Sequence, residues 1–330
     1  MKYLILIGDG MADQAAPPTY DRTPLEVAPT PGLDAMAQRG MLGQFGPIPP
    51  GMPAGSEIGI LSMFGFDPAT TFRGRAPMEA ANRDLPFGPE DLVFRCNFVH
   101  VEDGRMPSFT AGHISSEESA ELVAALNAGL ADRFSLTLYP GVGYRQLGVL
   151  KAGERGLPLE GLVCTPPHNI PEEDIAPHLP SGPGEDLVRE IMLASHEVMD
   201  RHPVNQRRRT AGQPPATQMW LWGQGTRPHI DTWQSLYGLS GAVISAVDLV
   251  NGIGKLAGFE VIDVPGVTGW IDTNYAGKWA YGAEALARHD VVVIHVEAPD
   301  ETAHQGRHDL KVQADRKSTR LNSSHTHLPR

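Results

Sequence analysis

DVVVIHVEAPDETAH, residues 290–304, joins a strongly apolar run to a short segment rich in acids and histidines. Residues 291–294 are an uninterrupted Val/Ile run, a pattern typical of a parallel strand that is buried on both faces. Pro299 blocks continuation of the strand, and the residues after it have the character of a helix start. Positions four apart lie on one helix face, so Asp300 and His304 present an oxygen and a nitrogen ligand together. Because open α/β sheets bind ligands at the carboxyl ends of their strands, the stretch predicts half of a metal site.

The composition limits the function classes. The 330 residues favour two structural units over one, and 41% hydrophobic with 20% charged residues is ordinary for a soluble globular protein. A net charge of -12 argues against a nucleic-acid groove, although a local basic pocket could still hold an anionic substrate. The two cysteines, Cys96 and Cys164, are too few for a disulfide framework and fit a reducing compartment. We expect a cytoplasmic protein without nucleic-acid or membrane partners, since residues 3–7 form too short an apolar run for a span or signal peptide.

The order of predicted elements indicates a discontinuous α/β core. Residues 1–90 and 213–314 alternate strands with helices, which predicts a mostly parallel sheet whose rhythm returns at a strand over residues 218–222. Residues 91–212 mix short alternating strands with amphipathic helices, and we expect them to form an inserted α+β domain. Residues 315–330 break the pattern: from about Arg316 they carry no acid and no apolar periodicity, and they resemble translated sequencing-adapter read-through. We therefore exclude this tail from fold reasoning.

Two residues near the start of the chain could complete the site. Asp9 follows the first strand between two glycines, and it is either a turn-capping residue or a metal ligand shared with Asp300. Oxygen-rich ligation with one imidazole suits Mn²⁺, Mg²⁺ or Zn²⁺. Ser56 follows a glycine and starts a helix, so it is either a simple N-cap or a nucleophile placed where a helix N-terminus favours phosphate.

Several basic residues could bind an anionic substrate. Each is more often a solvated surface charge, and only clustering in space would promote it to a binding role. Two histidines in loop-like contexts could be proton donors or merely turn residues. The basic candidates are Arg73, Arg75, Arg145, Arg207 and Lys278, and the two histidines are His113 and His168.

Together these residues resemble the archaeal-type cofactor-independent phosphoglycerate mutases, over residues 1 to about 314. The resemblance rests on GDGMAD (8–13), GSE (55–57), LSMFGFDP (61–68), FRCNF (94–98), WLWGQG (220–225), GAVISAVDL (241–249), DTNY (272–275) and EAPDE (297–301).

This resemblance implies an alkaline-phosphatase-like core with an inserted substrate-handling domain and two divalent metal ions, without 2,3-bisphosphoglycerate. It implies that Ser56 takes the phosphate of 3-phosphoglycerate and returns it to the 2-hydroxyl of the trapped glycerate. One metal would use Asp300 and His304, and the other Asp9 and Ser56.

The chain departs from the family at its end. The family's further ligands, an Asp-His pair and one more His from a C-terminal segment, find no match here, and about a fifth of a typical member is missing. We expect the native gene product to be a mutase and the chain as written to be truncated and inactive, since a half-built site binds metal weakly.

Two other function classes stay open. Relatives with segments like AGHIS (111–115) and HPVN (202–205) suggest a homoserine kinase-like phosphotransferase, although the sequence shows no nucleotide-binding motif. A binding protein that kept the fold and lost the chemistry is the third class. The metal identity and the oligomeric state do not follow from the sequence.

Overall fold

The computed structural model describes residues 1–15, 17, 21–158 and 160–318. The chain divides into two compact units, of which unit 1 comprises residues 1–71, 81–83 and 230–330 and unit 2 comprises residues 72–80 and 84–229. Unit 2 is thus inserted in the sequence of unit 1. The changeovers lie near residues 72–84 and 229, whereas the sequence placed them at 90 and 213. The roles predicted for the two parts stay predictions.

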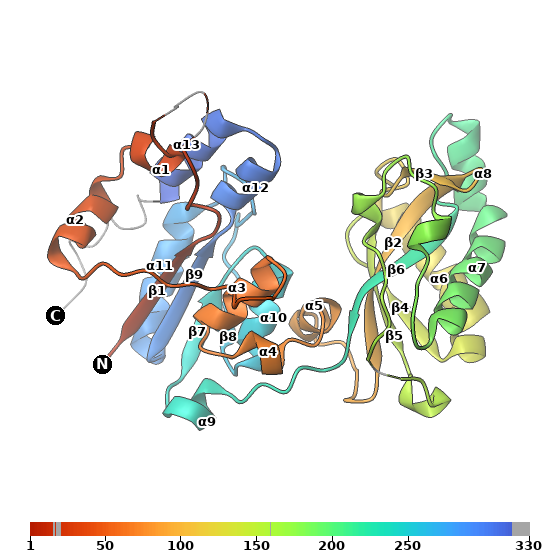
Figure 1. The fold of residues 1–330 in the computed structure, drawn as a ribbon, viewed down its shortest axis with the longest axis horizontal. Helices are drawn as coiled ribbons and strands as arrows, with labels where there is room; N and C mark the ends of the chain where they lie inside the picture. Colours follow the sequence, from red (N-terminus) through yellow and green to blue (C-terminus); the bar gives the residue numbers. More distant parts are fainter. Residues whose placement is uncertain (16, 18–20, 159, 319–330) are drawn as a thin grey trace. The chain divides into compact units, whose positions relative to one another are not determined.

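Unit 1 is built on a four-stranded parallel sheet with the order β1-β9-β7-β8 (Figure 1). Its strands are β1 (Tyr3–Gly8), β7 (Gly241–Ile244), β8 (Glu260–Val261) and β9 (Val291–Val296). Its helices are α1 (Pro24–Val27), α2 (Pro31–Arg39), α3 (Ser56–Met63), α4 (Pro68–Thr71), α9 (Trp233–Tyr237), α10 (Asp248–Leu256), α11 (Tyr275–Arg288), α12 (Ala298–His304) and α13 (His308–Ser318). The helix α5 (Ala76–Asn82) begins in unit 2 and ends in unit 1.

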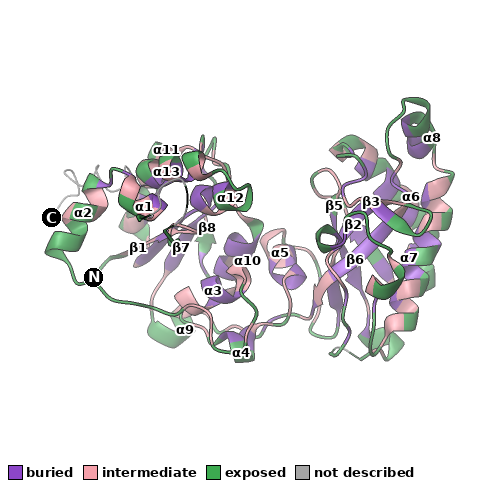
Figure 2. Ribbon diagram, turned by 45° about the horizontal axis from the view of Figure 1, so that its top comes forward, coloured by how far each residue is buried: buried purple, intermediate pink, exposed green. Residues whose placement is uncertain are grey.

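Helices cover both faces of this sheet, which explains the unbroken apolar run in β9. All six residues of β9 are buried. A Cβ on Gly282 of α11 would meet Ile294, and a Cβ on Gly254 of α10 would meet Val243, so the two helices lie against opposite faces. A parallel strand covered on both faces gains apolar burial at every position, and alternation is therefore absent from its sequence. The purple strands between helices in Figure 2 show this burial.

Unit 2 is an antiparallel α+β module. Its sheet has the order β3-β2-β5-β4, and β6 also pairs with β2. The strands are β2 (Leu92–Glu102), β3 (Arg105–Ser108), β4 (Leu136–Tyr139), β5 (Arg145–Leu150) and β6 (Gln218–Gly225), and the helices are α6 (Ser116–Phe134), α7 (Glu185–Asp200) and α8 (Pro203–Thr210). A capping box of Ser115 and Glu118 starts α6. The buried face of α7 packs toward β6.

The sequence predicts that a strand at residues 218–222 returns to the parallel sheet of the core, and this prediction was wrong. Residues 218–222 lie in β6, which pairs antiparallel with β2 from Val99↔Gln218 to Val93↔Gly225. Residues 219–222 are all buried, so their apolar run looks like that of a core parallel strand. Burial on both faces is compatible with either sheet, and only the pairing partner distinguishes them.

The predicted fold class is confirmed, with one parallel and one antiparallel sheet. In the described part of the chain, no helix combines the length and apolar character needed to cross a bilayer. The helix α13 runs to Ser318 and so takes in the first residues of the segment 315–330 that the sequence set apart. Residues 319–330 of that segment lie outside the described residues.

Two adjacent arginines of α8, one buried and one exposed, allow a test of how a buried arginine and its ion pair contribute to the stability of unit 2. Arg208 is 3% exposed, and its guanidinium donates to Glu118 at 2.6 Å, to the Ala111 carbonyl at 2.6 Å and to the Pro214 carbonyl at 2.9 Å. Arg208→Ala removes a buried cation whose donors satisfy the partly exposed Glu118 carboxylate and two backbone carbonyls, and we expect a loss of about 1.5–3 kcal/mol in the free energy of unfolding.

Its neighbour Arg207 is the matched control. Arg207 pairs with Glu121 at 2.8 Å, and both side chains are about half exposed, so Arg207→Ala should cost less than about 1 kcal/mol. Urea denaturation followed by tryptophan fluorescence measures both, and equal losses would contradict a buried role for Arg208.

Candidate metal centre and basic cluster

The ends of β1 and β9 bring functional side chains together at the carboxyl edge of the unit 1 sheet. The two strands pair in register, with Ile7 opposite His295 and Gly8 opposite Val296. The backbone N–H of Asp9 donates to the Val296 carbonyl at 3.0 Å and so continues the pairing past the strand end. Because side chains alternate along a strand, Asp9, His295 and Glu297 leave the two strands on the same face.

These three side chains form a compact donor set. His295 Nε2 lies 3.1 Å from Asp9 Oδ2 and 3.3 Å from Glu297 Oε2. One ligand atom from each residue lies within 4.8 Å of the others, and among the described residues this is a group of three that could hold a metal ion. Two carboxylates and one imidazole fit a divalent ion such as Mn²⁺, Mg²⁺ or Zn²⁺.

Asp300 joins this centre through the turn that follows Asp9. Gly10 has φ +69°, and a Cβ there would lie 2.5 Å from Asp300 Cα, so glycine allows the turn to approach the start of α12. The predicted helical turn is confirmed, with His304 Nε2 3.2 Å from Asp300 Oδ2. Burial and then repulsion from the Asp9 carboxylate raise the pKa of Asp300. Asp9, Asp300 and His304 therefore share one edge of the sheet, and their metal-binding roles stay predictions.

Ser56 is the first residue of α3 and is partly buried after an extended Gly55. The helix α3 packs against α10, which covers the face of the sheet opposite α11. Among the described residues, no hydrogen bond joins the Ser56 hydroxyl to Asp9 or Asp300. Its proposed role as nucleophile is left as a prediction.

Sequence reasoning assigned no role to His295 and Glu297, two residues of this centre. His295 stands within an apolar run and has the appearance of a core histidine, and Glu297 is one of several acids in the segment that follows the strand. The usable signal was their spacing: positions i and i+2 at a strand end share a face, next to a parallel strand that ends in an acid.

Lys278 lies beneath the centre. It is fully buried, and its Nζ donates to the His295 carbonyl at 2.6 Å. Burial lowers the pKa of Lys278 to about 8, while the nearby Glu297 carboxylate acts in the opposite direction. This position is apart from the surface basic residues with which the sequence grouped it, and its predicted contact with substrate stays untested.

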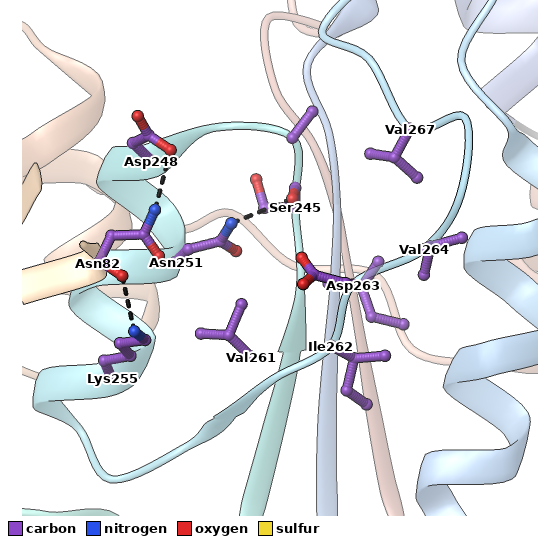
Figure 3. Close-up of a pocket in the computed structure, with 12 residues that line it drawn as sticks. Asn82, Ser245, Asp248, Asn251, Lys255, Val261, Ile262, Asp263, Val264 and Val267 are labelled. Atoms are coloured by element: carbon purple, nitrogen blue, oxygen red, sulfur yellow. Dashed lines mark hydrogen bonds between the residues drawn. The ribbon is translucent and has the colours of Figure 1, made fainter. Parts of the chain in front are cut away.

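A pocket of about 440 Å³ lies beyond Ser245, at the carboxyl ends of β7 and β8 (Figure 3). On one side Asn82 donates to Asp248 at 2.8 Å, and its carbonyl accepts from Lys255 at 2.6 Å. Asn251 Nδ2 donates to the Ser245 carbonyl at 3.2 Å. The opposite wall carries Val261, Ile262, Val264 and Val267 together with the carboxylate of Asp263. Ser245 borders both this pocket and the metal centre, because its hydroxyl lies 3.0 Å from His295 Nδ1.

Unit 2 holds a separate basic cluster around Trp222. Arg95 lies 4.2 Å above the Trp222 ring and pairs with Glu79 at 3.1 Å, and the same carboxylate accepts from Arg75 Nε at 2.9 Å. The ring of His168 lies 5.1 Å from the Trp222 ring. Burial, followed by the positive charges of Arg95, Arg75 and Arg145, lowers the pKa of His168.

The cluster therefore includes Arg75, Arg145 and His168 from the predicted set. His113 lies at its border, since its ring is 6.5 Å from Tyr144, over which Arg145 lies at 5.0 Å. Sequence reasoning missed Arg95, whose only signal was an arginine within the apolar run 93–98.

Arg207 and Arg73 enter none of these contacts among the described residues. Arg207 pairs with Glu121 on the surface of unit 2, and Arg73 donates to the Phe72 carbonyl at 3.1 Å.

Comparison with known proteins agrees with the geometry. The family model of the 2,3-bisphosphoglycerate-independent phosphoglycerate mutases matches residues 37–205. The mutase of that name from Methanothrix thermoacetophila is 47% identical over 314 residues, which cover 95% of this chain and 78% of the relative. A probable mutase of the same name from Geobacter sulfurreducens is 45% identical over 318 residues, which cover 95% and 78%.

Solved structures give the same result. The PH0037 protein from Pyrococcus horikoshii matches with a TM-score of 0.80 and 31% identity, over 98% of this chain and 77% of that one. The cofactor-independent phosphoglycerate mutase from Thermoplasma acidophilum shares the fold, with a TM-score of 0.64 and 24% identity over 98% and 83%. This chain belongs to the 2,3-bisphosphoglycerate-independent phosphoglycerate mutase family, as the resemblance of its motifs predicted.

Proposed function

We propose that the protein interconverts 3-phosphoglycerate and 2-phosphoglycerate through a phosphoserine at Ser56, without 2,3-bisphosphoglycerate. The observation that carries the proposal is the meeting of Asp9 with Asp300 and His304 at one sheet edge, in a chain of this family. The cytoplasm, where glycolytic enzymes act, is the proposed location.

Two divalent ions, Mn²⁺, Mg²⁺ or Zn²⁺, are the proposed cofactors. Asp300 and His304 would hold one ion, and Asp9 with Ser56 would hold the other. When bound, such ions neutralise phosphate charge and lower the pKa of a hydroxyl, which removes the need for a neighbouring histidine base. The donor types at this edge fit hard or borderline cations.

Ser56 is well placed to receive a phosphoryl group because it opens α3, where N–H groups and the helix dipole favour anions. Its Oγ would form a bond to phosphorus as the ester bond of 3-phosphoglycerate breaks, and the proton lost by Ser56 balances the one gained by glycerate. The 2-hydroxyl of the retained glycerate would then attack the phosphoserine, which restores Ser56 and gives 2-phosphoglycerate.

The basic cluster of unit 2 is the proposed binding surface for the substrate anion. It gathers three arginines, of which Arg75 and Arg95 contact Glu79 and Arg145 is exposed, within an acidic protein. The lowered pKa of His168 keeps this histidine neutral at pH 7, so that it can accept as well as donate a proton there.

The sequence led us to expect an inactive chain, which is the opposite of the proposed mutase activity. One assay decides between the two. With Mn²⁺ present, ³¹P NMR follows conversion of 3-phosphoglycerate. Turnover supports the proposal, whereas an inert chain supports the expectation. Phosphorylation of homoserine from ATP in a parallel sample would favour the kinase-like alternative.

We expect Ser56→Ala to reduce turnover by more than about a thousandfold, because the nucleophile is removed. Ser62→Ala changes a serine in the last turn of the same helix and should leave turnover near that of the unaltered chain. Mass spectrometry after incubation with substrate should find phosphate on Ser56. Equal losses in the two variants would contradict the nucleophile assignment.

We expect Arg145→Gln to raise KM for 3-phosphoglycerate by about tenfold or more, because hydrogen bonds to a charged group are worth about 1.5–3 kcal/mol. Arg207→Gln is its control, since Arg207 pairs with Glu121 outside the cluster. Steady-state kinetics of both variants tests the assignment, and a larger effect at Arg207 would overturn it.

We expect Asp300→Asn to stabilise the metal-free protein by about 0.5–2 kcal/mol, the range usual for relieving an unfavourable charge. Burial and Asp9 raise the pKa of Asp300, so its ionised form opposes folding at pH 8. The gain should disappear as the pH falls below the ordinary carboxyl value of 3.8, where Asp300 is protonated in both states.

Urea denaturation in EDTA at pH 8 and pH 3.5 measures this gain. Asp309→Asn is the control, because Asp309 is paired with Arg307 at 3.0 Å and its pKa is lowered, so that its loss should not stabilise. Adding Mn²⁺ should raise the melting temperature of the unaltered chain more than that of Asp300→Asn, and a destabilised Asp300→Asn in EDTA would contradict the argument.

A further inference from the structure

His295 is held rigidly between the strands of unit 1. It is fully buried in β9, between β1 and β7, and Lys278 fixes its backbone carbonyl at 2.6 Å. Its two ring nitrogens face different neighbours, Ser245 on one side and two carboxylates on the other. The hydrogen bonds at these nitrogens therefore determine which of them carries the proton.

On the Nδ1 side the bonding of Ser245 is decisive. The Ser245 hydroxyl accepts from the Val247 N–H at 3.0 Å and lies 3.0 Å from His295 Nδ1. A serine hydroxyl has one proton to donate, and among the described residues the acceptor that it meets is His295 Nδ1. This arrangement leaves Nδ1 without a proton.

On the Nε2 side the neighbours are acceptors. Asp9 Oδ2 lies at 3.1 Å and Glu297 Oε2 at 3.3 Å. A bare nitrogen lone pair there would face two carboxylate oxygens in a buried site, whereas an N–H satisfies them. Both sides of the ring place the imidazole proton on Nε2.

We propose that His295 is a positioning residue and not itself a metal ligand: Ser245 holds it as the Nε2–H tautomer, and it donates a hydrogen bond that orients the Asp9 carboxylate for metal binding. The chain of donors runs from the Val247 N–H through the Ser245 hydroxyl and the His295 ring to Asp9. The effect on metal binding rests on the proposed function, whereas the assignment of the tautomer is independent of it.

Orientation of Asp9 has a clear consequence. The hydrogen bond occupies Oδ2 and leaves Oδ1 to a cation. Residues that orient a metal-ligating carboxylate in this way typically change metal affinity by about 10–100-fold when they are removed. Three strand ends, those of β1, β9 and β7, then act on one ligand.

The tautomer is tested directly on the metal-free protein. Long-range ¹H–¹⁵N NMR of the imidazole rings at pH 8, with His295→Gln to assign the signal, should show a protonated Nε2 and an unprotonated Nδ1. Ser245→Ala should disturb that pattern. A protonated Nδ1 in the unaltered chain would overturn the proposal.

Metal affinity supplies the second measurement. Titration with Mn²⁺ monitored by electron paramagnetic resonance should show about 10–100-fold weaker binding in Ser245→Ala and His295→Asn. His295→Gln should recover much of the loss, because its amide nitrogen can donate from the Nε2 position, whereas that of Asn lies nearer Nδ1.

The matched control lies at the other end of the same strands. Ser240 donates to Asp290 Oδ2 at 2.8 Å, just before β7 and β9 begin, so Ser240→Ala removes a similar bond far from the centre. If Ser245→Ala weakens Mn²⁺ binding no more than Ser240→Ala, the positioning role is wrong. Failure of the unaltered chain to bind Mn²⁺ would count against the proposed function instead, and the NMR measurement would still decide the tautomer.

Discussion

The parallel pairing of β1 with β9 is the constraint on which unit 1 depends. It joins segments far apart in the sequence: Asp9 and His295 are 286 positions apart and 3.1 Å from each other. A pairing of such long range must repay its chain entropy through apolar burial. The apolar run of β9, buried at every position, supplies this burial. Because the pairing is in register, it also fixes which side chains meet at the carboxyl edge, and a slip by one residue would turn Asp9 away from His295.

The centre at that edge is costly to the fold. Carboxylates of Asp9, Asp300 and Glu297 gather where burial already disfavours charge, and the raised pKa of Asp300 is the visible sign. Lys278 offsets part of this cost, since its fully buried position near Glu297 brings a cation beneath the acids. Residues selected for stability alone would not be arranged in this way, and such concentrations of opposed pKa shifts are typical of functional sites.

Local patterns predicted what local physics determines. The strand at 291–296, the helical turn from Asp300 to His304 and the α/β class followed from burial periodicity and from the proline that ends the strand. The sheet to which residues 218–222 belong could not be predicted in this way. Residues 219–222 are all buried, and a buried apolar run is compatible with a parallel or an antiparallel sheet. His295 was missed for the same reason: in an apolar run, a histidine that meets a partner across the sheet cannot be told from one that merely fills space.

The basic cluster of unit 2 shows that the surroundings of a basic residue, and not its type, distinguish candidates for substrate binding. Arg75, Arg145, Arg207 and Lys278 are equivalent in the sequence, yet each meets a different environment. Arg207 is neutralised by Glu121 on an exposed helix, and Lys278 is enclosed beneath unit 1's centre. Arg75 and Arg95 both contact the Glu79 carboxylate, so positive charge is concentrated there, and Arg145 extends it to the surface. An anion gains most where cations outnumber their counter-ions and are already held in place, because little side-chain entropy is then lost on binding. The position of Arg145 beside Arg75 and Arg95 makes it a better candidate for contact with the substrate than Arg207, and this difference is visible only in three dimensions.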